Sequence, residues 1–149
     1  MEHSDDKIFA EFMDTLYTLA VSSVPSVLKA VVHAQASRNV TSYQEPKEWL
    51  DGLSNEDRKI FDFLLRLGAG MSVVSVLTLV DGMSGVIHAG NMVGDAELKL
   101  SLWNNIDDVS ETPPDRTVTV SSGTEITDAS LRFHNMVYKK LSELPEELE

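Results

Sequence analysis

Near the start of the chain, apolar residues recur at three- to four-residue spacing between Ser4 and Ser23. Positions with this spacing share one face of an α-helix, because the helix repeats every 3.6 residues. Ser4 is a suitable N-cap, and the two aspartates that follow it favour the positive end of the helix dipole. The stripe consists of Ile8, Phe9, Phe12, Met13, Leu16 and Leu19. This segment is predicted to be an amphipathic helix.

A second apolar stripe follows Pro25. Proline is favoured in the first turn of a helix, because a backbone N–H at that position would have no intrahelical acceptor. The stripe consists of Val27, Leu28, Val31 and Val32. The two helices are predicted to form a helical hairpin. The polar residues 38–46 then indicate a loop, and a short helix that follows is expected to stop at Gly52.

The longest helix is predicted from Asn55 to Val80. Ser54 and Asp57 have the spacing of a capping box at its start, with aspartate in place of the usual glutamate. At its end, Gly82 suits the left-handed conformation that closes many helices. The first half is amphipathic, and the second half is apolar on all sides.

No charged residue occurs from Leu67 to Val80. A helix that crosses a bilayer needs about 20 apolar residues, whereas a shorter run is more typical of a buried helix. Small residues in this run let neighbouring helices come close, and they are Gly68, Gly70, Ser72, Ser75 and Thr78. The helix is therefore predicted to fill a protein core rather than to span a membrane.

After this helix the periodicity changes to strict alternation, in residues 96–103 and again in residues 116–121. Alternation places every second side chain on one face of a strand, so the two segments predict an antiparallel pair with one buried face. Trp103 falls on the outward face. Residues 85–90 are a candidate third strand, and a long loop joins the main pair.

A last amphipathic helix is predicted from Thr127, as N-cap, to Pro145. Leu148-Glu149, at the end, is typical of a cloning scar and is left out of the fold. The predicted fold class is α+β and helix-rich. It has an N-terminal helical hairpin, a long central buried helix, a small antiparallel sheet and a C-terminal helix, in a single globular domain over residues 1–149.

The charge of the chain restricts its partners. Its 149 residues carry a formal net charge of −12, which repels nucleic-acid phosphates and anionic membranes and favours a basic protein surface as partner. Solubility alone also accounts for such a charge. The chain has no cysteine, hence no disulfide and no thiolate ligand. No secretory signal is present at the N-terminus, so a cytoplasmic location is expected.

The four histidines do not have the spacing of a metal site. They are His3, His33, His88 and His134, and no pair is four residues apart. The chain also lacks a Gly-x-Ser-x-Gly nucleophile motif and a phosphate-binding loop. No catalytic, cofactor-binding or metal-binding residue is therefore predicted. The alternative function is a small enzyme or ligand-binding domain that uses His88, His134 and nearby carboxylates.

The strongest candidate for binding is the loop between the two alternating segments. Residues 95–126 hold seven acidic against two basic residues, and the loop has no glycine of the kind that a calcium-binding loop requires. A solvated loop would have the same composition. An aromatic residue beside it favours an interface. The predicted partner-binding residues are Trp103, Asp107, Asp108, Glu111 and Asp115.

Four segments carry a resemblance to a known group of proteins: "LSNEDRKIFDFLLR", "SVLTLVDGM", "AELKLSLW" and "LRFHNMVYKKL". Their order resembles that of small bacterial proteins of the polymorphic-toxin immunity type. The Leu-x-Asp-Gly turn is matched by residues 79–82, whereas "LRFHN" departs from an adjacent Leu-His pair. The resemblance implies a non-enzymatic immunity or inhibitor-like module. A homodimer formed through the Gly- and Ser-rich middle of the long helix is compatible with either function.

Overall fold

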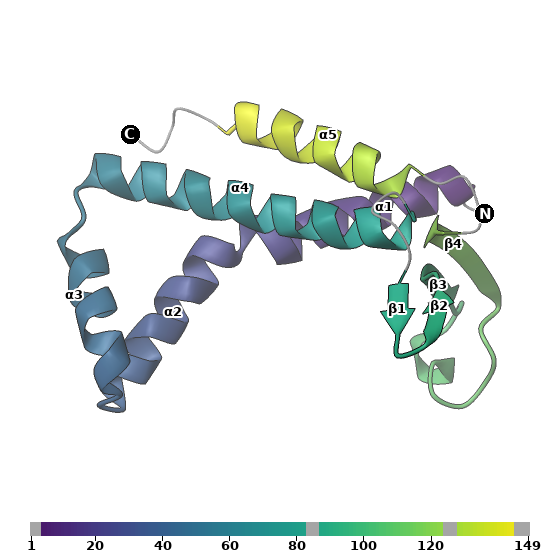
Figure 1. Cartoon of the computed structure of the whole chain (residues 1–149), viewed down its shortest axis with the longest axis horizontal. Helices are drawn as coiled ribbons and strands as arrows, with labels where there is room; N and C mark the ends of the chain where they lie inside the picture. The colour runs from purple at the N-terminus through teal and green to yellow at the C-terminus, as the bar shows by residue number, and fades with distance from the viewer. Residues whose placement is uncertain (1–3, 83–86, 124–127, 145–149) are drawn as a thin grey trace. The chain divides into compact units, whose positions relative to one another are not determined.

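A computed structural model describes residues 4–82, 87–123 and 128–144, except for the side chains of residues 87–89. The chain divides into two compact units. The first comprises residues 1–12 and 73–135, and the second comprises residues 13–72 and 136–149. The fold is a helix-rich α+β fold with small antiparallel sheets and a C-terminal helix, as predicted (Figure 1).

The N-terminal helical hairpin is not formed. Helix α1 (Asp5–Tyr17) continues through a π-helical turn (Thr18–Ser22) into α2 (Val24–Ser37). Ser23, between them, keeps helical torsion angles, φ −81° and ψ −14°, so the chain does not reverse. Pro25 is tolerated because it lies in the first turn of α2. The predicted N-cap is confirmed: the Ser4 hydroxyl accepts the Lys7 N–H at 3.4 Å.

A helical hairpin is formed instead by α2 and α3 (Gln44–Gly52), which lie side by side in Figure 1. A 3₁₀ turn (Thr41–Tyr43) connects them. The reversal begins at Asn39, which has a left-handed φ of 61° and donates its N–H to the carbonyl of Ala36. Asparagine tolerates this conformation better than most residues. Helix α3 ends at Gly52 as predicted.

Helix α4 spans Asn55–Val80, the predicted bounds. The Ser54 hydroxyl accepts the N–H of Asp57 at 3.1 Å and donates to its carboxylate at 2.7 Å, so the predicted cap is formed. Gly82 follows the helix with a φ of 71°, again as predicted.

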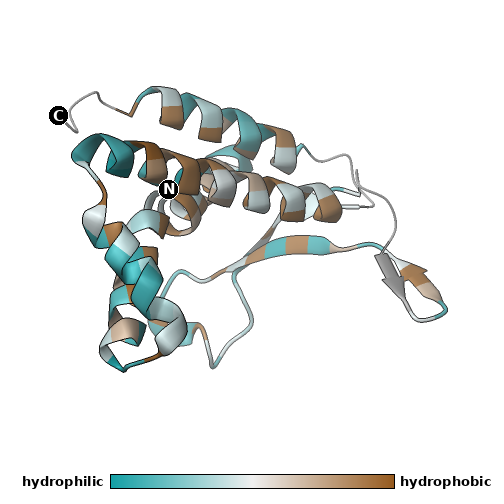
Figure 2. Cartoon of the chain, turned by 60° about the vertical axis from the view of Figure 1, so that its left-hand side comes forward, coloured by the Kyte–Doolittle hydropathy of each residue, from teal (hydrophilic) through white to brown (hydrophobic). Residues whose placement is uncertain are grey.

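The prediction that α4 fills a protein core is wrong for most of its surface. Only 11 % of its most apolar 18-residue stretch is buried, and apolar residues recur along the helix in Figure 2. One narrow stripe, which includes Gly70 and Leu77, is buried. Within the described residues, two helical stretches, Asp5–Ser37 and Asn55–Val80, are long and apolar enough to cross a membrane by length and composition.

The main sheet pairs β3 (Glu97–Leu102) with β4 (Arg116–Ser122) in antiparallel register, with an irregularity between Leu98 and Lys99. This confirms the predicted pair, and Val118 and Val120 are buried as expected. The candidate third strand does not join this sheet. It forms β1 (Ile87–Ala89), which pairs with β2 (Met92–Gly94) in a separate hairpin.

Helix α5 spans Ala129–Ser142. The predicted cap, Thr127, and the predicted stop, Pro145, lie outside the described residues. Each unit has its own buried apolar side chains. In the first unit they include Phe9, Leu77, Val118, Val120 and Phe133; in the second they include Met13, Tyr17, Val21, Leu50, Val137 and Leu141.

Candidate functional site

The loop between β3 and β4 is held closed at its base by two of the predicted site residues. Trp103 donates its indole N–H to the carbonyl of Thr112 at 2.9 Å, and Asp115 accepts the backbone N–H of Asn104 at 2.8 Å. Trp103 is half-buried rather than presented outward. The alternation that placed it on the outward face stops at Leu102, where β3 ends. Both residues therefore shape the loop.

Inside the loop, a 3₁₀ turn (Ile106–Asp108) begins at Asn105, whose side-chain oxygen accepts the N–H of Asp107 at 3.2 Å. The carbonyl of Asp108 accepts hydrogen bonds from the backbone N–H groups of Glu111 and Thr112, each at 3.1 Å. An ordered loop loses less conformational entropy when a partner binds. The loop thus has a defined conformation built from its own polar groups.

Two apolar side chains at the tip of this loop were not predicted as site residues. Ile106 is 84 % exposed, and Val109 is 49 % exposed. Asp107 and Glu111 beside them are also exposed, and Asp108 is half-buried. In the part of the chain that the structure describes, no ion pair involves a carboxylate of this loop. The loop therefore presents an apolar side chain among uncompensated negative charges.

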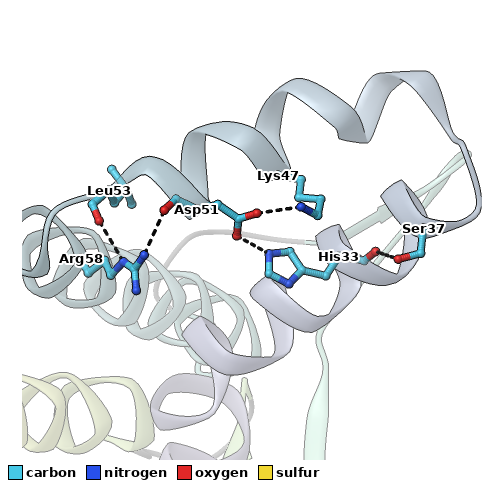
Figure 3. Close-up of polar contacts among 6 residues, drawn as sticks. All are labelled: His33, Ser37, Lys47, Asp51, Leu53 and Arg58. Carbon is cyan, nitrogen blue, oxygen red and sulfur yellow. Dashed lines mark hydrogen bonds and ion pairs between the residues drawn. The ribbon is translucent and has the colours of Figure 1, made fainter.

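A second polar cluster joins α2 to α3 (Figure 3). His33 Nε2 lies 2.9 Å from Asp51 Oδ1, and Lys47 Nζ lies 2.7 Å from Asp51 Oδ2. The hydrogen bond from Lys47 is the main cause that holds the pKa of Asp51 below its ordinary value, and His33 acts in the same direction. The Ser37 hydroxyl donates to the backbone carbonyl of His33 at 2.8 Å, so it is not activated by the imidazole. The cluster is a half-exposed clamp without a nucleophile.

Arg58 extends this clamp into α4. Its guanidinium donates to the carbonyls of Asp51 and Leu53, each at 3.1 Å (Figure 3). These carbonyls lie at the C-terminal end of α3, where helix carbonyls have no intrahelical donor. Arg58 thereby fixes the link between α3 and α4.

A buried polar cluster lies in the first unit, where α4 ends. The Asp81 carboxylate accepts hydrogen bonds from the Ser121 hydroxyl of β4 and, at 2.9 Å, from the N–H of Ser130 in the first turn of α5. All three residues are buried. Position 81 was predicted only as a helix stop. The cluster is anchored by backbone and hydroxyl donors, which suits a structural role.

The histidines of the alternative function remain a prediction. His88 lies in β1 opposite Val93, and its side chain is outside what the structure describes. His134 is half-buried in α5. Among the described residues, no group of three His, Asp or Glu side chains is arranged to hold a metal ion.

No protein-family model, curated protein or solved structure matches this chain.

Proposed function

We propose that this chain is a non-enzymatic protein-binding module of immunity or inhibitor type, which docks on a basic protein surface through the loop of residues 103–115. The observation that supports this function best is the exposure of Ile106 in a loop that is fixed by its own hydrogen bonds. A large apolar side chain in such a position is usually covered by a partner, because its burial is favourable by about 2 kcal/mol.

The acidic residues around Ile106 define the chemistry of the partner. Asp107 and Glu111 lie on the same loop, within a chain of net charge −12. Unpaired surface charges of one sign accelerate encounter with a surface of opposite sign, whereas a buried apolar anchor slows dissociation. The partner surface is therefore basic and has an apolar depression that accepts Ile106.

The proposal is tested by affinity capture with the chain as bait, at low salt, from a lysate of its source organism. The loop variant carries Asp107→Asn, Asp108→Asn and Glu111→Gln, and it keeps Asp115, which holds the loop closed. A control variant carries the same charge change on exposed acids elsewhere, Glu45→Gln, Glu48→Gln and Glu143→Gln. The association rate of the captured protein is then measured for each.

We expect a roughly tenfold slower association for the loop variant at low salt and a much smaller change for the control, because steering depends on charges close to the interface. If both variants slow association equally, net charge is responsible and the loop is not the interface. An association rate that is insensitive to salt would exclude a basic partner surface.

A further inference from the structure

Strand β3 lies at an edge of the main sheet, within the first unit. In the part of the chain that the structure describes, β3 pairs with β4 alone. A strand with one unpaired side presents a row of N–H and C=O groups on which another strand can pair. The unpaired side of β3 is here called the β3 edge.

One hydrogen bond shows which backbone groups point to the β3 edge. The carbonyl of Ala96, just before β3, accepts the N–H of Gly123 at 3.1 Å, so the backbone of Ala96 points towards β4. In an antiparallel pair this direction alternates from one residue to the next. The irregularity in the pairing adds a residue to β4, so the alternation along β3 is not interrupted. The N–H and C=O groups of Glu97, Lys99 and Ser101 therefore point to the β3 edge.

The side chains of β3 also alternate between two faces of the sheet. Glu97, Lys99 and Ser101 are exposed on one face, and Leu98, Leu100 and Leu102 are half-buried on the other. Leu100 lies opposite Val118 of β4, which is fully buried. The leucine row is thus less well covered than the strand beside it, and another strand at the β3 edge would extend its cover.

The charges of β3 are complementary to those of a second β3 strand. When two antiparallel copies are related by a two-fold axis at Leu98, Glu97 lies opposite Lys99 of the second copy. The same axis places Lys99 opposite the second Glu97, and Leu98 opposite its own counterpart. Each of the two charged pairs can exchange two N–H···O bonds, because the backbone groups of both residues point to the edge. Contacts of this reciprocal kind define a symmetric dimer interface.

The neighbouring registers are disfavoured by the same two residues. A shift of two positions is the smallest that keeps each face of the sheet together. In one direction it places Lys99 opposite Lys99, and in the other it places Glu97 opposite Glu97. Like charges directly opposite destabilise a strand pair. Within one chain Lys99 Nζ lies 2.9 Å from Glu97 Oε2, so in the favoured register the four charges alternate in sign both along and across the strands.

We infer that the chain forms a homodimer in which two β3 strands pair in antiparallel register about Leu98. The two sheets of two strands each then become one continuous sheet of four. Because the interface uses one short strand from each copy, the dimer dissociates on dilution. A lysine on an edge strand often serves to prevent pairing, but here Glu97 supplies its counter-charge. The same edge could accept an extended peptide of another protein, and the two-fold symmetry of the charges favours a second copy instead.

The test measures the mass of the full chain by sedimentation equilibrium over a range of concentrations. Salt at about 0.15 M screens long-range repulsion between two chains of net charge −12 and acts less on charges in contact. We expect the mass of wild type to rise from one copy towards two. Glu97→Lys and Lys99→Glu should each remain a single copy, because like charges then face each other at both pairs.

Two combinations should restore the dimer. A chain that carries both changes keeps every pair complementary, and so does an equimolar mixture of the two single variants. Recovery in either case also shows that the exchanged side chains do not unfold the chain. Lys7→Glu is the matched control, because it makes the same change of charge as Lys99→Glu at an exposed lysine of α1, in the same unit. This control should dimerise as wild type does.

A second measurement uses the absence of cysteine from the chain. The two Leu98 Cα atoms would lie about 4.5 Å apart, within the range that a disulfide requires. Leu98→Cys should therefore oxidise to a covalent dimer. Leu102→Cys, in the same half-buried row, should not, because eight residues at about 3.4 Å each, or about 27 Å, separate it from its counterpart.

Three outcomes would overturn the inference. The first is a wild-type mass that stays at one copy at every concentration. The second is dimerisation of both single charge variants as strongly as wild type, which would place the interface elsewhere. The third is a double variant that stays a single copy although its urea midpoint equals that of wild type, together with equal disulfide yields from Leu98→Cys and Leu102→Cys.

Discussion

The Oδ2 atom of Asp81 accepts a 2.9 Å hydrogen bond from the backbone N–H of Ser130, 49 positions further along the chain. The first N–H groups of a helix have no intrahelical acceptor, so a residue beyond the end of α4 satisfies one donor at the start of α5. The same carboxylate accepts the hydroxyl hydrogen of Ser121. One side chain therefore joins two helices and a strand of the first unit.

Loss of this carboxylate should destabilise the protein. Asp81→Asn keeps the shape of the side chain but removes its charge, and we expect the free energy of unfolding to fall by about 2 kcal/mol, the size of hydrogen bonds to a buried charged group. Urea denaturation measures the change. Asp128→Asn, an exposed change just before α5, is the control and should have little effect, since asparagine and aspartate cap helices about equally well. Equal stability of all three proteins would contradict the structural role.

Two glycines of α4 should respond in opposite ways to alanine. At Gly68 nothing blocks an added methyl group, so Gly68→Ala should raise the free energy of unfolding by up to about 1 kcal/mol through helix propensity. At Gly70 the new Cβ would lie 2.7 Å from Val137 Cγ1, and overpacking of this kind costs about 1–3 kcal/mol. Urea denaturation gives both values.

A double-mutant cycle can show that Val137 causes the loss of stability expected for Gly70→Ala. Val137→Ala removes the two methyl groups that crowd the new side chain, so the double variant should be more stable than the sum of the single changes predicts. Additive effects would show that the strain arises elsewhere.

The clamp between α2 and α3 should make stability depend on acidic pH. The pKa of Asp51 lies below its ordinary value of 3.8, so its ionised form is favoured by the fold. A group whose pKa is lower in the folded state than in the unfolded state stabilises the fold at pH values above its unfolded-state pKa. This stabilisation is lost as the pH falls through the folded-state pKa. The urea midpoint of wild type should therefore approach that of Asp51→Asn as the pH falls from about 5 to about 3. A constant difference over this range would show that the ion pairs in Figure 3 do not contribute.

Ile106 should matter for binding but not for folding. Because the side chain is 84 % exposed, Ile106→Ser should change the free energy of unfolding by less than about 0.5 kcal/mol. If the loop is the interface, the same change should increase the dissociation rate of the partner at least tenfold, since apolar anchors act mainly on dissociation. Stability is read from urea denaturation and dissociation from surface plasmon resonance. An unchanged dissociation rate would remove Ile106 from the interface.

Much of the fold follows from local signals. The bounds of α4 follow from the Ser54 cap and Gly82, and the β3–β4 pair follows from strict alternation, because these features depend on neighbours in the chain. The path from α1 to α2 was not predictable in this way. Pro25 is compatible with the start of a separate second helix, and equally with a continuous helix that passes through a π-helical turn. No residue in Thr18–Ser22 indicates which of these two paths the chain follows.

The exposure of α4 and the roles of the loop residues could not be predicted from the sequence for a different reason. Which faces of an apolar helix are covered depends on distant segments, as the contact between Gly70 and Val137 shows. Trp103 was expected to face outward because its strand was expected to continue, but a carbonyl nine positions away receives its N–H. Ile106 does not belong to any helical or alternating pattern of apolar residues, so the pattern analysis did not single it out. An isolated isoleucine in an acidic loop is nevertheless a signal for a contact residue.

The π-helical turn at Thr18–Ser22 makes the length of this segment critical. Met13, Tyr17, Val21 and Pro25 are buried at intervals of four residues. In a regular α-helix such a row drifts around the axis by about 40° per turn, and the wider turn reduces this drift. Deletion of Ala20 alone would swing every side chain of α2 by about 100° relative to those before it. This stretch should therefore accept many substitutions but no change in its number of residues.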